Sequence, residues 1–252
     1  MGNWTTTVRK LVPRRHLHRV LDIGSFFTGL VYSGNKMKCP VCGKTARRFM
    51  PYGIVKRPNT LCPHCFSLER HRLMWLYLER ETDFFATKPK LLHVAPERCF
   101  MRQFEKHLGE YYITADLDSP LAKVKMDIQN IPFPENEFGV IFCNHVLEHV
   151  DDDIQAMREM YRVMKPGGWG IMLVPVNTHR EKTYEDPSLT TREERERAFG
   201  QWDHLREYGL DYPERLRQAG FEVQVLDYAS SFSPEARNEY SLGGDLLYIV
   251  RK

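Results

Sequence analysis

A series of short apolar runs, each followed by polar residues, constrains the fold of this chain more than any other feature. The runs cover residues 91–94, 112–115, 139–143 and 170–174, and helical patterns separate them. Apolar runs that alternate with helical patterns predict a parallel sheet with helices on its faces. In such a sheet, ligands bind beyond the carboxyl ends of the strands. The polar residues that follow these runs are therefore candidates for a ligand site.

Three segments of this region carry a family resemblance. They are residues 127–134 (DIQNIPFP), 146–150 (VLEHV) and 162–168 (RVMKPGG). In this order and spacing they resemble class I S-adenosylmethionine-dependent methyltransferases of the type 11-like group, and the resemblance extends over residues 89–252. It implies an α/β fold, in which a doubly wound, mostly parallel seven-stranded sheet ends in an antiparallel strand.

The resemblance also implies which residues hold the cofactor. Asp116, which ends the second run, matches the acid that accepts hydrogen bonds from both ribose hydroxyls, and Asp118 is the second candidate. Asp127 and Ile128 match the pair that holds the adenine amino group and packs on the ring. Asn144 follows the next run, where the family's chain borders the methionine part of the cofactor and the acceptor.

The first loop departs from the family pattern, which has an acid followed by a glycine-rich turn. His93 stands in the place of the acid, and the glycine places hold Ala95, Glu97 and Cys99. Glycines let the backbone approach a ligand closely. We include His93, Ala95 and Glu97 in the expected cofactor site, with the hypothesis that Glu97 reaches the amino group or the ribose.

A long polar insertion at residues 177–212 is expected to form a lid or acceptor site. Within it, His204 is the first candidate for a general base because imidazole titrates near neutral pH. His145 and Tyr208 are the next candidates. In many small-molecule methyltransferases of this type, a His and a Tyr four residues apart precede the next helix. The alternative interpretation makes His204 a helix cap and Tyr208 a packing aromatic.

Four cysteines in two pairs predict a metal site. Cys39 and Cys42 form the first C-x2-C pair, and Cys62 and Cys65 form the second after 19 intervening residues. This spacing is typical of a structural zinc site with four thiolates, which leaves no open coordination position. Iron in a rubredoxin-like site is the alternative. Arginines and lysines surround the cluster, so the module is interpreted either as an RNA-docking or substrate-docking surface or as a rigid cap.

Four regions follow from these patterns. We expect a basic amphipathic arm at residues 1–35, a zinc ribbon at 36–70, a connecting helix at 71–88 and a methyltransferase domain at 89–252. The arm is interpreted either as a membrane or anionic-partner contact or as a packed helix with solvated charges. The chain has no run of about 18 apolar residues and no secretory pattern. A cytoplasmic location is therefore expected. The net charge of +3 neither demands nor excludes nucleic acid.

The sequence thus predicts a methyltransferase that uses S-adenosylmethionine, carries a structural zinc ion and acts on a small molecule or saccharide. Two other functions are compatible with the same residues. One is a ribosomal or transfer RNA methyltransferase whose ribbon docks the RNA. The other is a non-catalytic binding module, because the first loop lacks its glycines.

Overall fold

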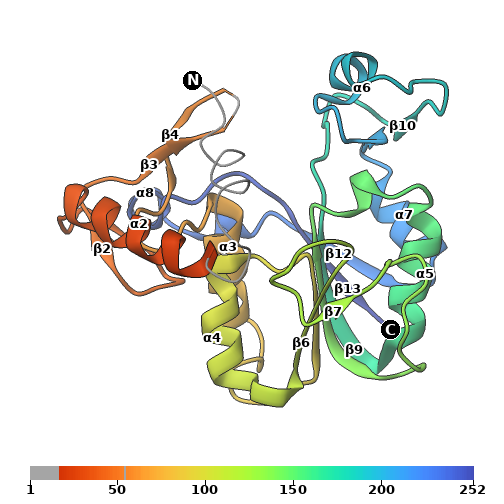
Figure 1. The fold of residues 1–252 in the computed structure, drawn as a ribbon, viewed down its shortest axis with the longest axis horizontal. Helices are drawn as coiled ribbons and strands as arrows, with labels where there is room; N and C mark the ends of the chain where they lie inside the picture. Colours follow the sequence, from red (N-terminus) through yellow and green to blue (C-terminus); the bar gives the residue numbers. More distant parts are fainter. Residues whose placement is uncertain (1–16, 54) are drawn as a thin grey trace. The chain divides into compact units, whose positions relative to one another are not determined.

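The structure is a computed structural model that describes residues 17–53 and 55–252, with side chains from residue 24 onward (Figure 1). It forms two compact units. The first comprises the described part of Met1–Phe85 together with Glu97–Arg102 and Asp227–Asp245. The second comprises Ala86–Pro96, Gln103–Leu226 and Leu246–Lys252.

The described part of the first unit consists of short strands and short helical segments. Its strands form two antiparallel pairs, β1 with β2 and β3 with β4. The elements are α2 (Leu17–Val31), β1 (Met37–Lys38), β2 (Thr45–Ala46), β3 (Met50–Tyr52), β4 (Arg57–Leu61), α3 (Glu69–Arg80), the 3-10 turn Tyr228–Ser231 and α8 (Pro234–Tyr240).

The basic arm expected at residues 1–35 is described only in its second half, which contains α2. The apolar side chains of Phe26, Phe27, Leu30 and Val31 on this helix are all more than half exposed. Arg9, Lys10, Arg14 and Arg15 lie outside the described residues. In the part of the chain that the structure describes, no helix combines the length and hydropathy needed to cross a membrane.

A buried arginine explains why residues 227–245 belong to the first unit rather than to the expected C-terminal domain. The guanidinium of Arg72, on α3, donates hydrogen bonds to the backbone carbonyls of Tyr240 and Ser241, each at 2.7 Å. It also donates to the carbonyls of Thr60 and Ser67 at 3.0 and 2.8 Å. One charged side chain therefore joins the second cysteine pair to the end of α8.

Part of the same segment forms a helix although its composition is polar. Residues 230–244 have the composition of a polar loop, yet they contain the end of the 3-10 turn and all of α8. The Oγ of Ser233 accepts a hydrogen bond from the Ala236 amide, and Pro234 occupies the first turn of the helix. A serine N-cap followed by proline is a known helix start. This local signal could have identified α8.

The second unit is built on a seven-stranded sheet. Its strand order is β12-β13-β9-β8-β5-β6-β7, and every neighbouring pair is parallel except the two that contain β13. This order confirms the predicted doubly wound sheet. The antiparallel strand is β13, which is the last strand in the sequence and lies between β12 and β9 in the sheet. The strands are β5 (Leu91–Val94), β6 (Tyr112–Asp116), β7 (Val124–Lys125), β8 (Phe138–Asn144), β9 (Met164–Leu173), β12 (Glu222–Leu226) and β13 (Leu247–Arg251).

Helices and short elements connect these strands. Helices α5 and α7 lie side by side (Figure 1) and contact β9 and β12, respectively. The helices are α4 (Arg98–Leu108), which runs from the first unit into the second, α5 (Asp153–Val163), α6 (Arg192–Phe199) and α7 (Tyr212–Gln218), with 3-10 turns at Gly109–Tyr111 and Leu147–His149. The insertion at residues 177–212 contains α6 and an antiparallel pair, β10 (Tyr184–Glu185) with β11 (Arg206–Glu207).

Helix α5 ends earlier than its sequence suggests. Residues 166–168 (PGG) are typical of a helix stop, but α5 already ends at Val163 and β9 begins at the next residue. A residue that precedes proline disfavours helical dihedrals, so Lys165 is extended. Gly167 then adopts a left-handed conformation with φ of 75° inside the strand. The PGG segment is therefore part of β9.

A buried ionic network attaches the insertion to the rest of the second unit. Asp153, at the start of α5, is only 2% exposed and pairs with Arg215 at 2.6 Å and Arg206 at 3.9 Å. Arg206 also donates to the carbonyls of Leu147 and Val150. Burial alone would raise the pKa of Asp153, but the hydrogen bond from Arg215 and the charge of Arg206 outweigh it and lower the pKa.

Replacing this carboxylate should destabilise the second unit in a pH-dependent way. Because the folded state lowers the pKa of Asp153, its contribution is present above about pH 3.9, the ordinary aspartate value, and is lost as pH falls through the folded-state pKa. We expect Asp153→Asn to reduce the free energy of unfolding at pH 7 by about 3–5 kcal/mol. The free energies of unfolding of Asp153→Asn and of the natural chain should become more alike below about pH 4.

Urea unfolding at pH 7 and at pH values below 4 measures both effects. Asp151→Asn is the matched control because Asp151 is exposed, so that change should stay within about 0.5 kcal/mol. A loss of stability that is the same at every pH would contradict the ionic account.

Candidate functional site

The loop after β5 adopts the backbone conformation that the missing glycine would favour. Ala95 has φ of +46°, in the left-handed region that side chains with a Cβ rarely adopt. Its amide donates a 2.8 Å hydrogen bond to the carbonyl of Ala115 on the neighbouring strand. The alanine therefore retains the turn at a cost of about 1–2 kcal/mol in backbone strain. Strain of this kind is concentrated at functional sites.

His93, which stands in the place of the family's acid, lies inside the sheet. It is fully buried, and its Nδ1 hydrogen-bonds the hydroxyl of Tyr112 at 2.8 Å. Its ring also lies beside those of Phe104 and Phe142. These contacts give His93 a role in the packing between β5 and β6. The assignment of His93 to the cofactor site stays a prediction.

Asp116 lies at the carboxyl end of β6, where it is half-buried. Its Oδ1 accepts hydrogen bonds from the amides of Asp118 and Ser119, at 2.8 and 2.7 Å. These two bonds fix the orientation of the carboxylate and leave Oδ2 to face another partner. Asp118 itself is exposed, and its carboxylate lies 3.4 Å from Lys125.

Asp127 and Asn144 lie after β7 and at the end of β8. Asp127 is exposed, and its Oδ1 accepts a 2.8 Å hydrogen bond from the Gln129 amide. Ile128 beside it is only 5% exposed, as is Asn144. Since β5, β6 and β8 are parallel neighbours, Ala95, Asp116 and Asn144 follow the same edge of the sheet.

His145, directly after β8, is a second strained residue at this edge. Its φ is +55°, and its Nδ1 lies 3.4 Å from Oε1 of Glu148. Glu148 belongs to the 3-10 turn and is 1% exposed. Its Oε2 is buried and has no hydrogen-bond partner within residues 24–53 and 55–252. The carboxylate thus has one oxygen beside His145 and one that is unsatisfied.

Two further histidines lie beside that carboxylate. The rings of His149 and His204 meet edge to face with centroids 4.9 Å apart. His149 Nδ1 hydrogen-bonds the carbonyl of Asp203 at 2.9 Å. Burial lowers the pKa of His204, and the nearby His149 lowers it further, against the opposing charges of Glu148 and Asp203. These effects together favour the neutral imidazole of His204.

The other expected base, Tyr208, is turned into the interior. It is fully buried, and its hydroxyl donates a 2.7 Å hydrogen bond to Asp153 Oδ2. Burial raises the pKa of Tyr208 well above its ordinary value, and the charge of Asp153 adds to the effect. In this structure Tyr208 is part of the ionic network that attaches the insertion.

Glu97 belongs to the first unit. Its carboxylate lies 3.8 Å from Nε2 of His71, and the Sγ of the buried Cys99 lies 3.4 Å from Nδ1 of the same histidine. Burial raises the pKa of Cys99 well above that of an ordinary thiol. The assignment of Glu97 to the cofactor stays a prediction.

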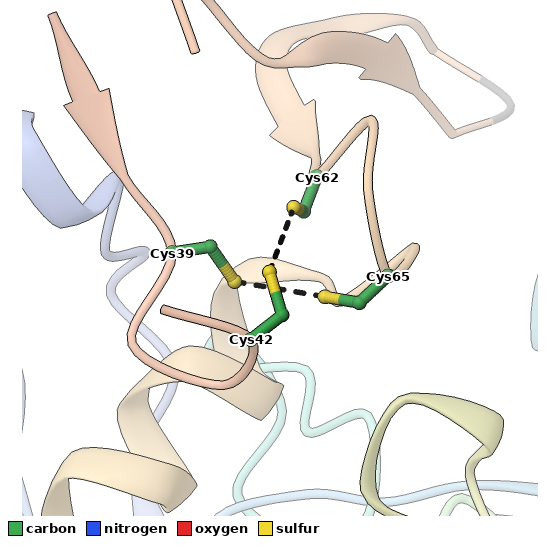
Figure 2. A group of neighbouring side chains, drawn as sticks. All are labelled: Cys39, Cys42, Cys62 and Cys65. Atoms are coloured by element: carbon green, nitrogen blue, oxygen red, sulfur yellow. Dashed lines mark hydrogen bonds between the residues drawn. The ribbon is translucent and has the colours of Figure 1, made fainter. Parts of the chain in front are cut away.

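The four paired cysteines converge in the first unit. Figure 2 shows their sulfurs facing one another from the two turns. The Sγ atoms of Cys39 and Cys65 are 3.6 Å apart, and those of Cys42 and Cys62 are 3.9 Å apart. Four thiolates around one tetrahedral zinc ion, at about 2.3 Å each, would be separated by about 3.8 Å. The donor set and its spacing therefore fit a zinc ribbon.

The two turns have matching backbones. The residue after each pair, Gly43 or Phe66, is left-handed, with φ of 71° and 60°. The amides of these residues donate to the carbonyls of Cys39 and Cys62, respectively. His64, inside the second pair, instead hydrogen-bonds the Thr45 carbonyl.

Sequence reasoning did not identify Arg206, Asp153 and Arg215 as one network. Asp153 could be identified only as an acid at a helix start, and the arginines follow it by 53 and 62 positions. No periodic pattern links charges over such distances. The sequence also does not distinguish Glu148 from other acids, because its unpartnered oxygen is visible only in three dimensions.

Comparisons with known proteins match a segment of this chain. Residues 97–172 match a family model described as a methyltransferase domain. Over 45 residues the chain is 44% identical to a ubiquinone/menaquinone biosynthesis C-methyltransferase of Pseudoalteromonas translucida, and the match covers 18% of either protein. Over 51 residues it is 45% identical to a demethylmenaquinone methyltransferase of a Geobacillus species, covering 19% of this chain and 22% of that protein.

The curated relatives share only a segment with this chain, which spans about a fifth of their length. Among solved structures, an S-adenosylmethionine-dependent methyltransferase from Mesorhizobium loti aligns with 71% of this chain and 98% of its own, at 17% identity and a TM-score of 0.46.

Replacing Ala95 with glycine should relieve the strain in the first loop. Glycine adopts positive φ without a steric penalty but loses more entropy on folding, about 0.4–1 kcal/mol. We therefore expect Ala95→Gly to increase the free energy of unfolding by about 0.5–1 kcal/mol, the part of the strain that exceeds this entropy loss.

Urea unfolding of Ala95→Gly beside Ala115→Gly measures this effect. Ala115 is buried in β6 with no positive φ, so glycine there should destabilise by about 0.5–1 kcal/mol. Equal destabilisation by both changes would show that Ala95 is not strained.

Proposed function

We propose that this chain, whose residues 97–172 match a methyltransferase domain, transfers a methyl group from S-adenosylmethionine to a hydroxyl group of a small molecule or saccharide. The observation that carries the proposal is the oriented carboxylate of Asp116 at the carboxyl end of β6. It lies on the edge of the sheet where ligands bind in open α/β folds.

The cofactor would lie along that edge. With Oδ1 of Asp116 occupied by two backbone amides, Oδ2 is the atom offered to the ribose hydroxyls. Asp127 would accept from the adenine amino group while the side chain of Ile128 packs on the ring. The strained turn at Ala95 would let the backbone approach the methionine part, and this argues for a ligand-binding loop despite the missing glycines.

The acceptor would meet the methyl group beside the segment that follows β8. S-adenosylmethionine supplies an already activated methyl group, so the chain mainly has to orient the acceptor oxygen in line with the breaking bond and exclude water. A hydroxyl acceptor must also lose its proton. His145 and His204 are the proposed proton acceptors, and both lie beside Glu148.

The insertion at residues 177–212 is the proposed acceptor lid. The network of Asp153, Arg206 and Arg215 attaches it to α5. Its Trp202 is about half exposed, and Arg192 lies 3.9 Å from the centroid of its ring. An exposed indole with a polar edge suits a hydroxylated acceptor.

We also propose that the cysteine cluster holds a structural zinc ion. Four thiolates would fill its coordination sphere and leave no position for a substrate. The ion would compensate for the small hydrophobic core of the ribbon. Reduced thiols are maintained in the cytoplasm, which is the proposed compartment.

Calorimetric titration with S-adenosylmethionine tests the proposal. In Asp116→Asn the amide can retain the turn through Oδ1, but its NH2 group cannot accept from the ribose. We expect this change to weaken binding by about 1.5–3 kcal/mol, roughly 10- to 150-fold, because a charged acceptor is lost. Glu222→Gln is the control, since Glu222 is an exposed acid at the start of the edge strand β12, at the opposite end of the sheet from Asp116, and it should change the affinity by less than about threefold.

The same titration separates the competing functions. No binding to the folded protein would favour a non-catalytic module and reject the enzyme. Cofactor binding that strengthens in the presence of transfer RNA would favour RNA as the acceptor. Transfer of label from the methyl-labelled cofactor to that RNA, measured in a separate assay, would then replace the small-molecule proposal.

A further inference from the structure

We propose that Glu148, His149 and His204 form a second metal site, which binds a divalent first-row transition-metal ion. One carboxylate oxygen and one ring nitrogen from each histidine lie within 4.8 Å of one another. Ligands at about 2.0–2.2 Å from one ion are at most about 4.4 Å apart. Small side-chain rotations are therefore enough to bring the three donors onto one ion.

The buried carboxylate is the strongest evidence for an ion. Glu148 is 1% exposed, and Oε2 has no hydrogen-bond partner among the residues that the structure describes. A buried carboxylate oxygen without a partner is unfavourable by several kcal/mol. The carboxylate of Glu148 pairs with the imidazole of His145, and the imidazoles of His149 and His204 lie beside it. A cation at Oε2 would satisfy this oxygen.

Each donor also has the outer partner that metal ligands typically have. The Nδ1 of His149 hydrogen-bonds the Asp203 carbonyl, so Nε2 is the nitrogen available to an ion. Oε1 of Glu148 faces His145, which leaves Oε2 for the ion. His204 interacts with the Phe199 backbone. Such outer contacts orient ligands and fix which atom binds.

The donor set indicates the kind of ion and its possible use. Two imidazoles and a carboxylate suit zinc, cobalt, iron or nickel better than magnesium or calcium, which prefer oxygen ligands alone. Three protein ligands leave at least one position open for water or a substrate oxygen. If the proposed methyl transfer holds, an ion here would polarise the acceptor hydroxyl, and His204 would be a ligand rather than the base. The ion site itself does not depend on that reaction.

Cobalt titration of the full chain tests the site without any cofactor. The ribbon is first loaded with zinc, and Co²⁺ is then added while the visible spectrum is recorded. We expect d–d absorption typical of nitrogen and oxygen ligands, without the charge-transfer band of cobalt thiolates. Total metal at saturation should reach two ions per chain.

Matched variants assign the ion to these residues. His149→Ala and Glu148→Gln should weaken cobalt binding by about 100-fold or more, because even the loss of an outer partner weakens metal binding roughly 10- to 100-fold. His149 is a third exposed and glutamine has the shape of glutamate, so both variants should retain the fold, as circular dichroism would verify. His179→Ala removes an exposed histidine outside the cluster and should bind normally.

Cys62→Ser should show the opposite pattern, losing the ribbon zinc but retaining the cobalt spectrum. Absence of a cobalt spectrum in the natural chain, or a spectrum unchanged in folded His149→Ala and Glu148→Gln, would overturn the proposal and leave these side chains a structural role. Either result is independent of S-adenosylmethionine binding, so the failure of this site and the failure of the proposed methyl transfer are distinguishable.

Discussion

The acceptor side of the candidate site depends on one buried charge, the carboxylate of Asp153. A charge at 2% exposure must be paired, and its partners Arg206 and Arg215 come from the insertion and from α7. Arg206 additionally bonds three carbonyls of the segment that carries Glu148 and His149. His204 lies two residues before Arg206, so the pairing that neutralises Asp153 also brings His204 to Glu148. Packing, electrostatics and the geometry of the candidate site are thus connected through one residue.

The proposed cofactor side of the site depends on the backbone instead. Ala95 and His145 are both left-handed residues with a Cβ, and each directly follows a central parallel strand. Strain at two strand ends of one sheet edge is expected where a ligand needs close approach or a fixed side chain. It gives a physical reason to consider the glycine-poor loop a binding loop.

The sequence predicted those parts of the molecule that local patterns determine. Apolar runs ending in polar residues located β5, β6, β8 and β9, and the cysteine spacing brought four sulfurs together because each turn is local. Contacts between distant polar residues were not predictable. Arg72 donates hydrogen bonds to backbone carbonyls 168 and 169 positions away. Every residue has a backbone carbonyl, so no sequence pattern shows which ones an arginine will contact. For the same reason the grouping of Asp227–Asp245 with the first unit required the structure.

The central claim is that S-adenosylmethionine binds at the carboxyl ends of β5, β6 and β8. A crystal structure of the chain with S-adenosylhomocysteine tests it most directly. The account predicts that the ribose hydroxyls contact Asp116 Oδ2, that the adenine lies against Ile128 with its amino group at Asp127, and that Ala95 keeps its positive φ. A product molecule bound elsewhere, or a fully occupied crystal form with Asp116 turned away from the ribose, would contradict it.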